Sequence, residues 1–242
     1  MSSGARAAAV AAALALSLGA SSCSVDPAER EYLAALRGEE TGMTRVEQIE
    51  RIDRAIARAP DRAWYRETHA IYSIDLHRFE QAAADLDTAI VLADRPNLRY
   101  LRGLVTCQRG DFGGSLADFG RAIAGQPENS QFYRGRALAQ VAVGMNQEAL
   151  VDAERLVTLA PQWGISYYVR GAALSALGRD RDAIADFDES LRRRPELIYP
   201  LRARAASYDR LGESARAAAD REEARRREER ESSAVCLDPF RY

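Results

Sequence analysis

Lysine is absent from this chain, and all 34 of its basic residues are arginine. The chain therefore offers no lysine for a Schiff base or for a phosphate-binding loop. Histidine is limited to His69 and His77, and cysteine to three residues. No group of them has the spacing of a zinc site, and the acidic residues are dispersed at helical intervals. These absences predict a protein that is not an enzyme, with no catalytic residues, metal or cofactor.

Long apolar runs and an excess of positive charge are also lacking. The apolar stretch from Ala7 to Leu18 is too short to span a bilayer comfortably. Without its first 22 residues, whose only charged side chain is Arg6, the chain carries 33 arginines against 36 acidic residues, a net charge of -3. This balance gives no electrostatic reason to expect nucleic acid as a partner. With 47% hydrophobic residues and few strand-like runs, the composition predicts an all-helical fold.

A helix-turn-helix pattern returns at least five times with a period of about 34 residues. The copies begin near Ala63, Pro96, Ser130, Gly164 and Ile198. When the repeat is numbered from 1 to 34, columns 8 and 20 hold only small residues: Ala70, Gly103, Ala137, Gly171 and Ala205, then Ala82, Ser115, Ala149, Ala183 and Ala217. Small residues at these points let the two helices of a pair approach closely.

Column 24 indicates where the array ends. It holds the large apolar residues Leu86, Phe119 and Phe187, a smaller Ala153, and finally Arg221. The last pair of a stacked array has no following repeat to cover it, so a polar residue is expected there. Arg221 therefore predicts the end of the array, and the charged run that follows it continues a solvated face.

These columns resemble those of the tetratricopeptide repeat family. The family pattern has a small residue at column 8, glycine at 15, alanine at 20 and 27, and proline at 32. Glycine stands at column 15 in four copies, and proline at column 32 in three: Gly110, Gly144, Gly178 and Gly212, then Pro127, Pro161 and Pro195. The first copy departs from the pattern, with His77 in the glycine column. The resemblance implies a right-handed α-solenoid of about five helix pairs over residues 61–231. Without lysine, the carboxylate clamp that some of these domains use is disfavoured.

A degenerate sixth unit precedes the array, over residues 30–60. Thr44 and Glu47 have the spacing of a capping box, and Ile49, Ile52 and Ile56 fall on one helix face. Pro60 closes this segment in phase with the repeats. A helical hairpin is therefore expected here.

Residues 1–22 have the layout of a secretory signal peptide. The segment from Gly19 to Cys23 resembles a bacterial lipobox, which implies cleavage before Cys23, a lipid on its thiol and a short linker over residues 23–29. Ser24, rather than aspartate, follows Cys23, and this favours the outer membrane, facing the periplasm. The alternative is an ordinary signal peptide cut after Ser22, since Ala20 and Ser22 also satisfy the small-x-small rule.

One acidic column recurs at fixed phase. Position 23 is always aspartate, and position 7 is arginine in four copies: Asp85, Asp118, Asp152, Asp186 and Asp220, then Arg102, Arg136, Arg170 and Arg204. The aspartates could bind a metal or a basic partner, or each could pair with an arginine along a helix seam. We favour the structural pairing, in which His69 takes the arginine column of the first copy. If these pairs are exposed, each contributes only about 0–1 kcal/mol.

Two further cysteines, Cys107 and Cys236, lie in a chain whose N-terminus predicts export to a compartment where disulfides form. The family places the column of Cys107 on the inner surface, so a disulfide would bring the tail, residues 232–242, back across it. The alternative is a free, buried Cys107. The tail itself could cap the last repeat, fill the groove or remain unattached.

In this family, first helices line the concave groove through columns 2, 5, 9, 12 and 13. Aromatic residues and arginines occur at these columns, and such residues supply most of the binding energy at protein interfaces. The candidate partner-binding residues are Trp64, Tyr100, Arg134, Tyr168, Tyr199 and Arg202. The alternative for Trp64 is packing between repeats. Either an extended peptide or an amphipathic helix fits such a groove.

The resemblance therefore implies a lipid-anchored interaction scaffold of the bacterial envelope. It is similar to pilotins that assemble secretins of type IV pili, to adaptors of peptidoglycan hydrolases and to barrel-assembly lipoproteins. The partner expected is a protein of one of these kinds. The competing hypothesis is a small-ligand receptor or an accessory subunit of an envelope enzyme, which would need a closed polar pocket.

Overall fold

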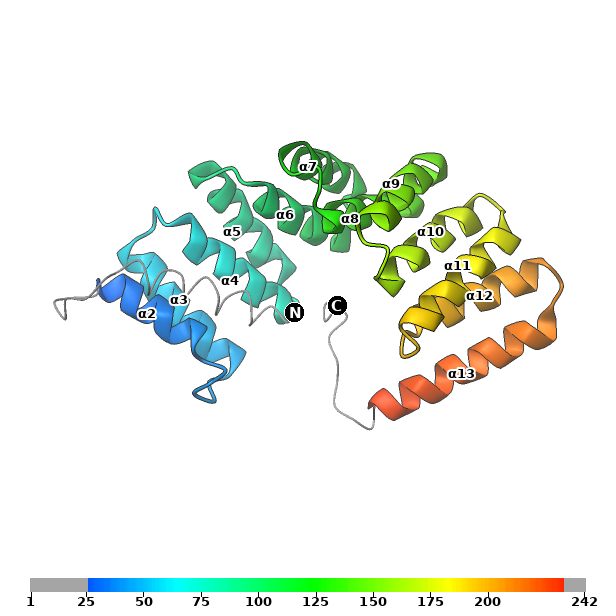
Figure 1. Cartoon of the computed structure of the whole chain (residues 1–242). Coiled ribbons are helices and arrows are strands. Elements are labelled where there is room, and N and C mark those ends of the chain that lie inside the picture. Colours follow the sequence, from blue (N-terminus) through cyan, green and yellow to red (C-terminus); the bar gives the residue numbers. More distant parts are fainter. Residues whose placement is uncertain (1–25, 233–242) are drawn as a thin grey trace. The chain divides into compact units, whose positions relative to one another are not determined.

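The computed structural model describes residues 26–232, so the signal peptide, Cys23 and Cys236 lie outside the described residues. Within this range the chain forms twelve α-helices and no strand (Figure 1). The predicted all-helical fold of helix pairs is confirmed. The helices form two compact units, of which residues 26–105 and 106–232 are described. The boundary falls within α6.

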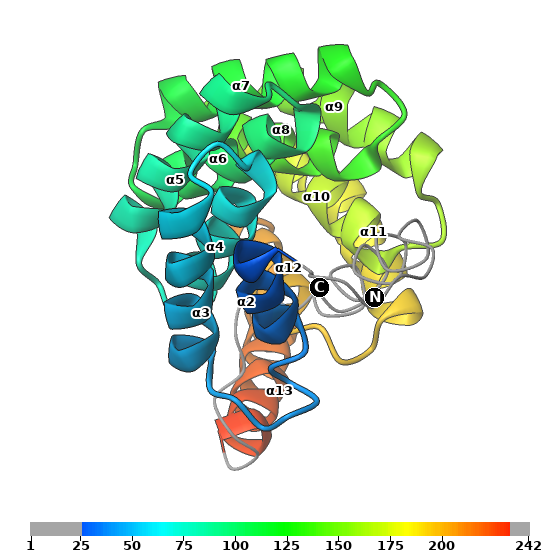
Figure 2. The ribbon, with the colours of Figure 1, turned by 90° about the vertical axis from the view of Figure 1, so that its left-hand side faces the viewer.

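The first unit contains four whole helices and most of a fifth: α2 (Pro27–Leu36), α3 (Arg45–Arg58), α4 (Ala63–Asp75), α5 (Phe79–Leu92) and α6 (Pro96–Gln108). Helices α2 and α3 lie side by side as the predicted hairpin (Figure 2). The capping box is present, because the Thr44 amide donates to Glu47 Oε2 at 2.8 Å and the Glu47 amide donates to Thr44 Oγ1 at 3.3 Å. Ile49 and Ile52 are buried behind it, as their spacing predicts.

The second unit continues with seven helices: α7 (Phe112–Gly125), α8 (Ser130–Ala142), α9 (Asn146–Leu159), α10 (Gly164–Ala176), α11 (Asp180–Arg193), α12 (Tyr199–Arg210) and α13 (Ser214–Ser232). Helices α8 with α9, α10 with α11, and α12 with α13 form pairs (Figure 1). The first helix of each later pair also packs on both helices of the pair before it, α10 on α8 and α9, and α12 on α10 and α11. Each repeat therefore covers the face that the preceding repeat leaves open.

Small residues at column 8 allow the close helix crossing that the sequence predicts. A Cβ atom at Gly171 would lie 2.7 Å from Phe187 Cε1 and 3.2 Å from the carbonyl oxygen of Ala183, on the facing helix. Phe187 itself is fully buried. The glycine therefore makes room for the aromatic ring. The chain also pairs these two columns by size, since it has Gly171 with Phe187 but Ala70 with Leu86.

His77 ends the first helix of its pair in a conformation that suits glycine. Its φ is 56°, whereas the glycines at the same column have φ between 75° and 81°: Gly110, Gly144, Gly178 and Gly212. The geometry is kept because the Arg78 amide donates to the carbonyl oxygen of Ser73 at 2.8 Å. A left-handed backbone costs a residue with a Cβ atom about 1–2 kcal/mol. His77 therefore stores local strain in the first unit.

Replacing His77 by glycine is expected to stabilise the first unit by about 1 kcal/mol, because the left-handed strain disappears while glycine adds entropy to the unfolded chain. Urea denaturation followed by circular dichroism measures this gain. The matched control is Gly178→Ala, which should cost about 1 kcal/mol, since no atom lies within 4 Å of the added Cβ and only the backbone conformation opposes it. A loss of stability in His77→Gly would contradict this account of the turn.

Candidate functional site

The recurring aspartates pair with the recurring arginines inside each helix pair of the second unit. Arg136 donates from Nε and Nη2 to the two carboxylate oxygens of Asp152 at 2.6 and 2.7 Å. Arg170 with Asp186 and Arg204 with Asp220 repeat this two-bond geometry, at distances of 2.6 to 2.8 Å. The structural pairing is therefore confirmed.

These pairs are more buried than an exposed ladder would be. The Asp152 side chain is 5% exposed and the Arg136 side chain 27%. The hydrogen bonds that Arg136 donates to Asp152 hold the pKa of Arg136 above its ordinary value. The estimate of about 0–1 kcal/mol per pair applies to solvent-exposed ions. Since the carboxylates are buried here, removing one leaves its arginine without compensation and costs more.

His69 takes the same structural place in the first unit. It is 2% exposed, and its Nδ1 lies 2.5 Å from Asp85 Oδ2, while Arg66 donates to Asp85 Oδ1 at 3.1 Å. His69 Nε2 lies 3.1 Å from Asp53 Oδ1 on α3, although without hydrogen-bond alignment. This histidine joins three helices and occupies the column where later copies have arginine. These contacts support its interpretation as a structural residue.

Two of the column-7 arginines, Arg102 and Arg204, also reach the preceding repeat. Arg204 forms an ion pair with Asp188 on α11 as well as with Asp220 on α13. In the first unit, Arg102 Nη1 lies 2.7 Å from Asp87 Oδ1 on α5. These arginines thus link consecutive pairs. The ladder accounts for Asp85, Asp152, Asp186 and Asp220 without a ligand.

The six predicted groove residues fall in both units. Trp64 and Tyr100 lie on α4 and α6 of the first unit, and both are half-buried. The Trp64 ring packs against the cluster formed by Tyr32, Ile52 and Tyr65, with its centroid 5.7 Å from that of Tyr65. Its indole Nε1 is buried without a hydrogen-bond partner. Much of the Trp64 side chain is therefore engaged in packing, and its role in binding stays a prediction.

The other four predicted residues lie in the second unit. Arg134 on α8 is half-buried. Tyr168 on α10 packs against Phe187 and Tyr199, with ring centroids 6.2 Å apart in both cases. Burial raises the pKa of the Tyr168 hydroxyl. Tyr199 is 39% exposed, and the Arg202 side chain is 61% exposed. Tyr199 and Arg202, one turn apart on α12, are the more accessible of these side chains.

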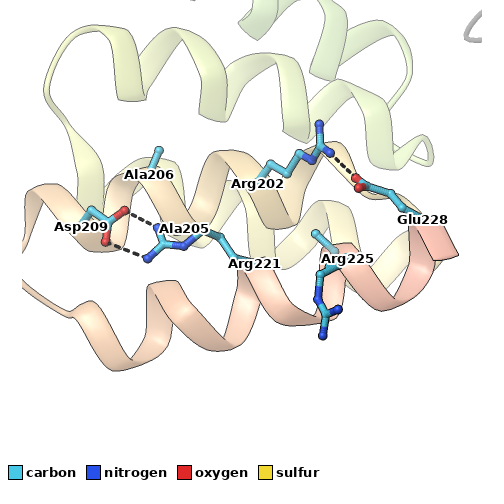
Figure 3. Close-up of a pocket in the computed structure, with 8 residues that line it drawn as sticks. Arg202, Ala205, Ala206, Asp209, Arg221, Arg225 and Glu228 are labelled. Atoms are coloured by element: carbon cyan, nitrogen blue, oxygen red, sulfur yellow. Dashed lines mark hydrogen bonds and ion pairs between the residues drawn. The ribbon is translucent and has the colours of Figure 1, made fainter.

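An open cleft of about 490 Å³ lies between α12 and α13 (Figure 3). Its floor consists of Ala205, Ala206 and Ala224, of which Ala206 is exposed and the other two are buried by their neighbours. Its other lining residues are charged: Arg202, Asp209, Arg221, Arg225 and Glu228. Arg202 pairs with Glu228 near one end, and Arg221 Nη1 donates to Asp209 Oδ2 at 2.5 Å near the other. The cleft combines an alanine floor with two ion pairs that join its helices.

Arg225 lines the same cleft but turns its side chain away from α12 in the close-up (Figure 3). It donates to Glu222 and Glu229 on its own helix at 2.9 Å. Ion pairs this exposed contribute only about 0–1 kcal/mol each. The ion pairs that join α12 and α13 across the cleft, Arg202 with Glu228 and Arg221 with Asp209, can therefore be replaced by ion pairs to a ligand at little cost in free energy.

The cleft is the face that a following repeat would cover. The equivalent face of the preceding pair, on α10 and α11, lies under α12: Tyr168 contacts Tyr199, and Ser175 Oγ lies 3.2 Å from Ser207 Oγ. In the last pair the corresponding positions are Arg202 and Asp209. Arg221 is 53% exposed where Phe187 is fully buried. Arg221 thus has the exposure expected of a residue in the last pair, and the end of the array at this point stays a prediction.

Cys107, in the part of α6 that belongs to the second unit, is half-buried, and burial raises the pKa of its thiol. Because Cys236 lies outside the described residues, the disulfide stays a prediction. Among residues 26–232, no three histidine, cysteine or acidic side chains are grouped so that they could hold a metal ion. No helix in the same range is long and apolar enough to cross a membrane.

The fold is that of tetratricopeptide repeat proteins of known structure. A tetratricopeptide repeat protein from Parabacteroides merdae ATCC 43184 superposes with a TM-score of 0.72 at 15% identity, over 81% of this chain and 78% of that one. YrrB, described as a TPR protein with an unusual peptide-binding site, matches with a TM-score of 0.61 at 16% identity, over 74% and 91% of the two chains.

A third structure is MamA, residues 41 to the end, from Desulfovibrio magneticus RS-1, with a TM-score of 0.60 at 17% identity, over 69% of this chain and 95% of that one. No protein-family model matches the chain, and no curated protein matches it in sequence. At these identities the likeness establishes the fold alone.

Sequence reasoning identified Arg202, and it singled out Arg221 as the end of the array, but it did not predict that these residues line one cleft with Glu228 and Asp209. Glu228 carries no signal in a column-by-column comparison, because the earlier copies have unrelated residues there: Ala93, Gln126, Ala160 and Arg194. Asp209 stands at column 12, a groove column of the family, but no earlier copy has a charged residue at that column. The signal that could have found them is Arg221 itself. If the array ends at Arg221, the face between the last two helices has no following repeat to cover it. The residues of that face that correspond to Tyr168 and Ser175 are Arg202 and Asp209.

Proposed function

We propose that this protein is a non-catalytic scaffold that binds a protein partner through α12 and the α12–α13 cleft. One observation carries the proposal: the last helix pair leaves open a face that a helix covers in the pair before it. The floor of small side chains admits a backbone at close range. A surface of this shape suits a polypeptide segment.

The cleft also indicates the chemistry of the segment it would bind. Three arginines and two carboxylates line it, so a segment with an acidic residue can replace Glu228 or Asp209 as the partner of an arginine. Apolar side chains of the segment would cover the alanine floor, and Tyr199 offers an aromatic contact beside it. An amphipathic helix or an extended peptide with one acidic residue satisfies these conditions.

The partner site is testable with two double variants, each of which replaces one exposed apolar or aromatic residue and one arginine by alanine. Tyr199→Ala with Arg202→Ala should weaken capture of the partner from envelope extracts by about tenfold or more, since aromatic and arginine side chains dominate interface energies. Val151→Ala with Arg155→Ala on α9 removes an exposed apolar residue and an exposed ion-paired arginine elsewhere, and should leave capture unchanged. Equal loss in both variants would contradict the site.

We further propose that the scaffold is anchored to the bacterial envelope through a lipid on Cys23, at the outer membrane. The support is the sequence from Gly19 to Cys23 and the serine that follows it. Two or more acyl chains would hold the protein at the bilayer, because each buried methylene contributes about 0.8 kcal/mol. Anchoring raises the local concentration of whatever the scaffold binds. Secretin subunits, peptidoglycan hydrolases and barrel-assembly proteins are the partner classes proposed.

Metabolic labelling with an alkyne-bearing palmitate tests the anchor. The full-length chain expressed in bacteria should incorporate label, and Cys23→Ser should abolish incorporation, because its hydroxyl replaces the only thiol near the signal cleavage site. Cys107→Ser serves as the control and should label like the unaltered chain. Absence of label from the unaltered chain would support the ordinary signal peptide instead, and label retained in Cys23→Ser would contradict Cys23 as the lipid site.

A small-ligand receptor is the second candidate, and the cleft favours it less. The cleft is open, its floor is apolar, and its charged side chains already pair with one another. Small-ligand sites are concave, and they enclose much of the ligand's surface. Stabilisation of the purified protein by a metabolite would favour this candidate.

A further inference from the structure

We propose that the link between the α2–α3 hairpin and the first repeat depends on a proton, and that His69 on α4 holds this proton. The His69 ring is 2% exposed and lies between two carboxylates from different helices, Asp85 on α5 and Asp53 on α3. The inference concerns the first unit alone. It does not rest on the partner or the lipid anchor proposed above.

Arginines at the same column of other repeats show what this position does when its charge is permanent. Arg204 forms ion pairs with Asp220 at column 23 of its own repeat and with Asp188 at column 25 of the repeat before it. Arg102 Nη1 likewise lies 2.7 Å from Asp87, which is at column 25 of the preceding repeat. A cation at column 7 thus joins consecutive repeats through their aspartates.

His69 has the same two kinds of neighbour. Asp85 is at column 23 of its own repeat. Asp53 stands seven residues before Pro60, the proline that closes the degenerate hairpin in phase with column 32, so it falls at column 25. The histidine therefore occupies the place of a bridging arginine. Unlike arginine, histidine gains and loses its charge between about pH 5 and pH 8.

The proton decides how many of the two carboxylates the ring can bond. His69 Nδ1 lies 2.5 Å from Asp85 Oδ2, and Nε2 lies 3.1 Å from Asp53 Oδ1. A neutral imidazole has one N–H group and one lone pair, whereas an imidazolium donates from both nitrogens. When Nδ1–H faces Asp85, the neutral ring turns its lone pair toward the oxygen of Asp53. Nε2 is buried without a hydrogen-bond partner, and protonation supplies the donor that this contact lacks.

The charged groups around the ring come from α3, α4 and α5. Arg66, on the same helix as His69, donates to Asp85 Oδ1 at 3.1 Å. Two carboxylates and one guanidinium leave one negative charge, which an imidazolium neutralises. Burial of the ring opposes its charge. Because the Asp53 side chain is 57% exposed and can turn toward water, the gain from bonding it is that of a partly exposed ion pair.

Apolar contacts hold the hairpin to α4 at every pH. Tyr32 on α2 packs against Tyr65 on α4, with ring centroids 4.7 Å apart, and Ile52 on α3 belongs to the same buried cluster. Loss of the proton therefore weakens the attachment of the hairpin without detaching it. The stabilisation is present while the ring is protonated and is lost as the pH rises.

Urea denaturation of the full chain at about pH 5.5 and about pH 8 tests the link. Every protein carries Trp163→Phe, which leaves Trp64 as its only tryptophan. Trp64 packs against the cluster that holds the hairpin, so its fluorescence reports on this part of the first unit. The folding equilibrium constant at one urea concentration should rise from the higher to the lower pH. This rise should be about fivefold larger with His69 than in His69→Arg, whose charge does not change.

Asp53→Asn separates the proton-dependent link from a role of His69 in packing alone. It keeps the histidine and changes an exposed side chain, and it should reduce the rise to that of His69→Arg or lower, because the asparagine amide can donate to the neutral ring. His77→Asn is the control for the chain's other histidine, and it should keep the full rise. Asparagine tolerates the left-handed backbone at this turn.

Three results would overturn the inference. The first is a rise in the natural chain no larger than that in His69→Arg. The second is an undiminished rise in Asp53→Asn, which would exclude the bond to α3. The third is loss of the rise in His77→Asn, which would assign the pH dependence to the exposed turn after α4.

Discussion

Replacing Gly171 by valine is expected to lower the free energy of unfolding of the second unit by about 3 kcal/mol. The added Cβ would stand 2.7 Å from Phe187 Cε1, and the carbonyl oxygen of Ala183 lies behind at 3.2 Å. Phe187 is fully buried, and close packing around a buried ring opposes its displacement. Urea denaturation of the full chain, followed by circular dichroism, measures the loss.

A double-mutant cycle with Phe187→Leu tests whether the contact with the Phe187 ring causes this loss of stability. The first repeat has alanine and leucine at these two columns, as Ala70 and Leu86. Gly171→Ala should destabilise the natural chain but stabilise the Phe187→Leu chain by about 1 kcal/mol, since alanine favours a helix over glycine by that amount. The sign of one substitution thus depends on the facing residue. The same sign in both backgrounds would contradict size matching between the columns.

Asp152→Ala is expected to cost about 2–3 kcal/mol, because it leaves the half-buried guanidinium of Arg136 without its two hydrogen bonds. The expected loss in the free energy of unfolding is smaller than for a fully buried ion pair, since 27% of the Arg136 side chain is exposed to water. Urea denaturation measures this loss as well. Capture of the partner at a temperature where the protein stays folded should not change.

Glu128→Ala is the control for Asp152→Ala. It breaks the pair that Arg155 on the same helix, α9, forms with Glu128 at 2.8 Å, in which the Glu128 side chain is 75% exposed. An exposed pair contributes about 0–1 kcal/mol, so this variant should unfold almost like the natural chain. Equal losses in the two variants would show that burial does not set the strength of the ladder.

The repeat columns predict most of the fold because they record contacts that recur once per period. Small residues at column 8, aspartates at column 23 and arginines at column 7 all have the roles expected of them in the second unit. The columns could not predict that the aspartates are buried. Periodicity shows on which face of a helix a residue lies, but not how far neighbouring side chains cover it. The size match of Gly171 with Phe187 can be found in the sequence, but only when columns 8 and 24 are compared with each other.

The candidate site was harder to predict than the fold. Columns 2 and 5 gave Tyr199 and Arg202, which are exposed, but they also gave Tyr168, which packs between repeats. Column membership alone cannot separate these cases. The difference arises from the next repeat: α12 packs on α10 and covers Tyr168, whereas within residues 26–232 no further helix follows α13.

The most direct test of the account places a photocrosslinking amino acid at position 199 in the full-length protein, in cells that express it from its own promoter. Position 151 on α9, where Val151 is 58% exposed, carries the same probe as a control. The account predicts a protein adduct of one defined mass from position 199 and none from position 151. Adducts from position 151 alone, or the same adducts from both positions, would contradict binding of a partner at α12 and its cleft.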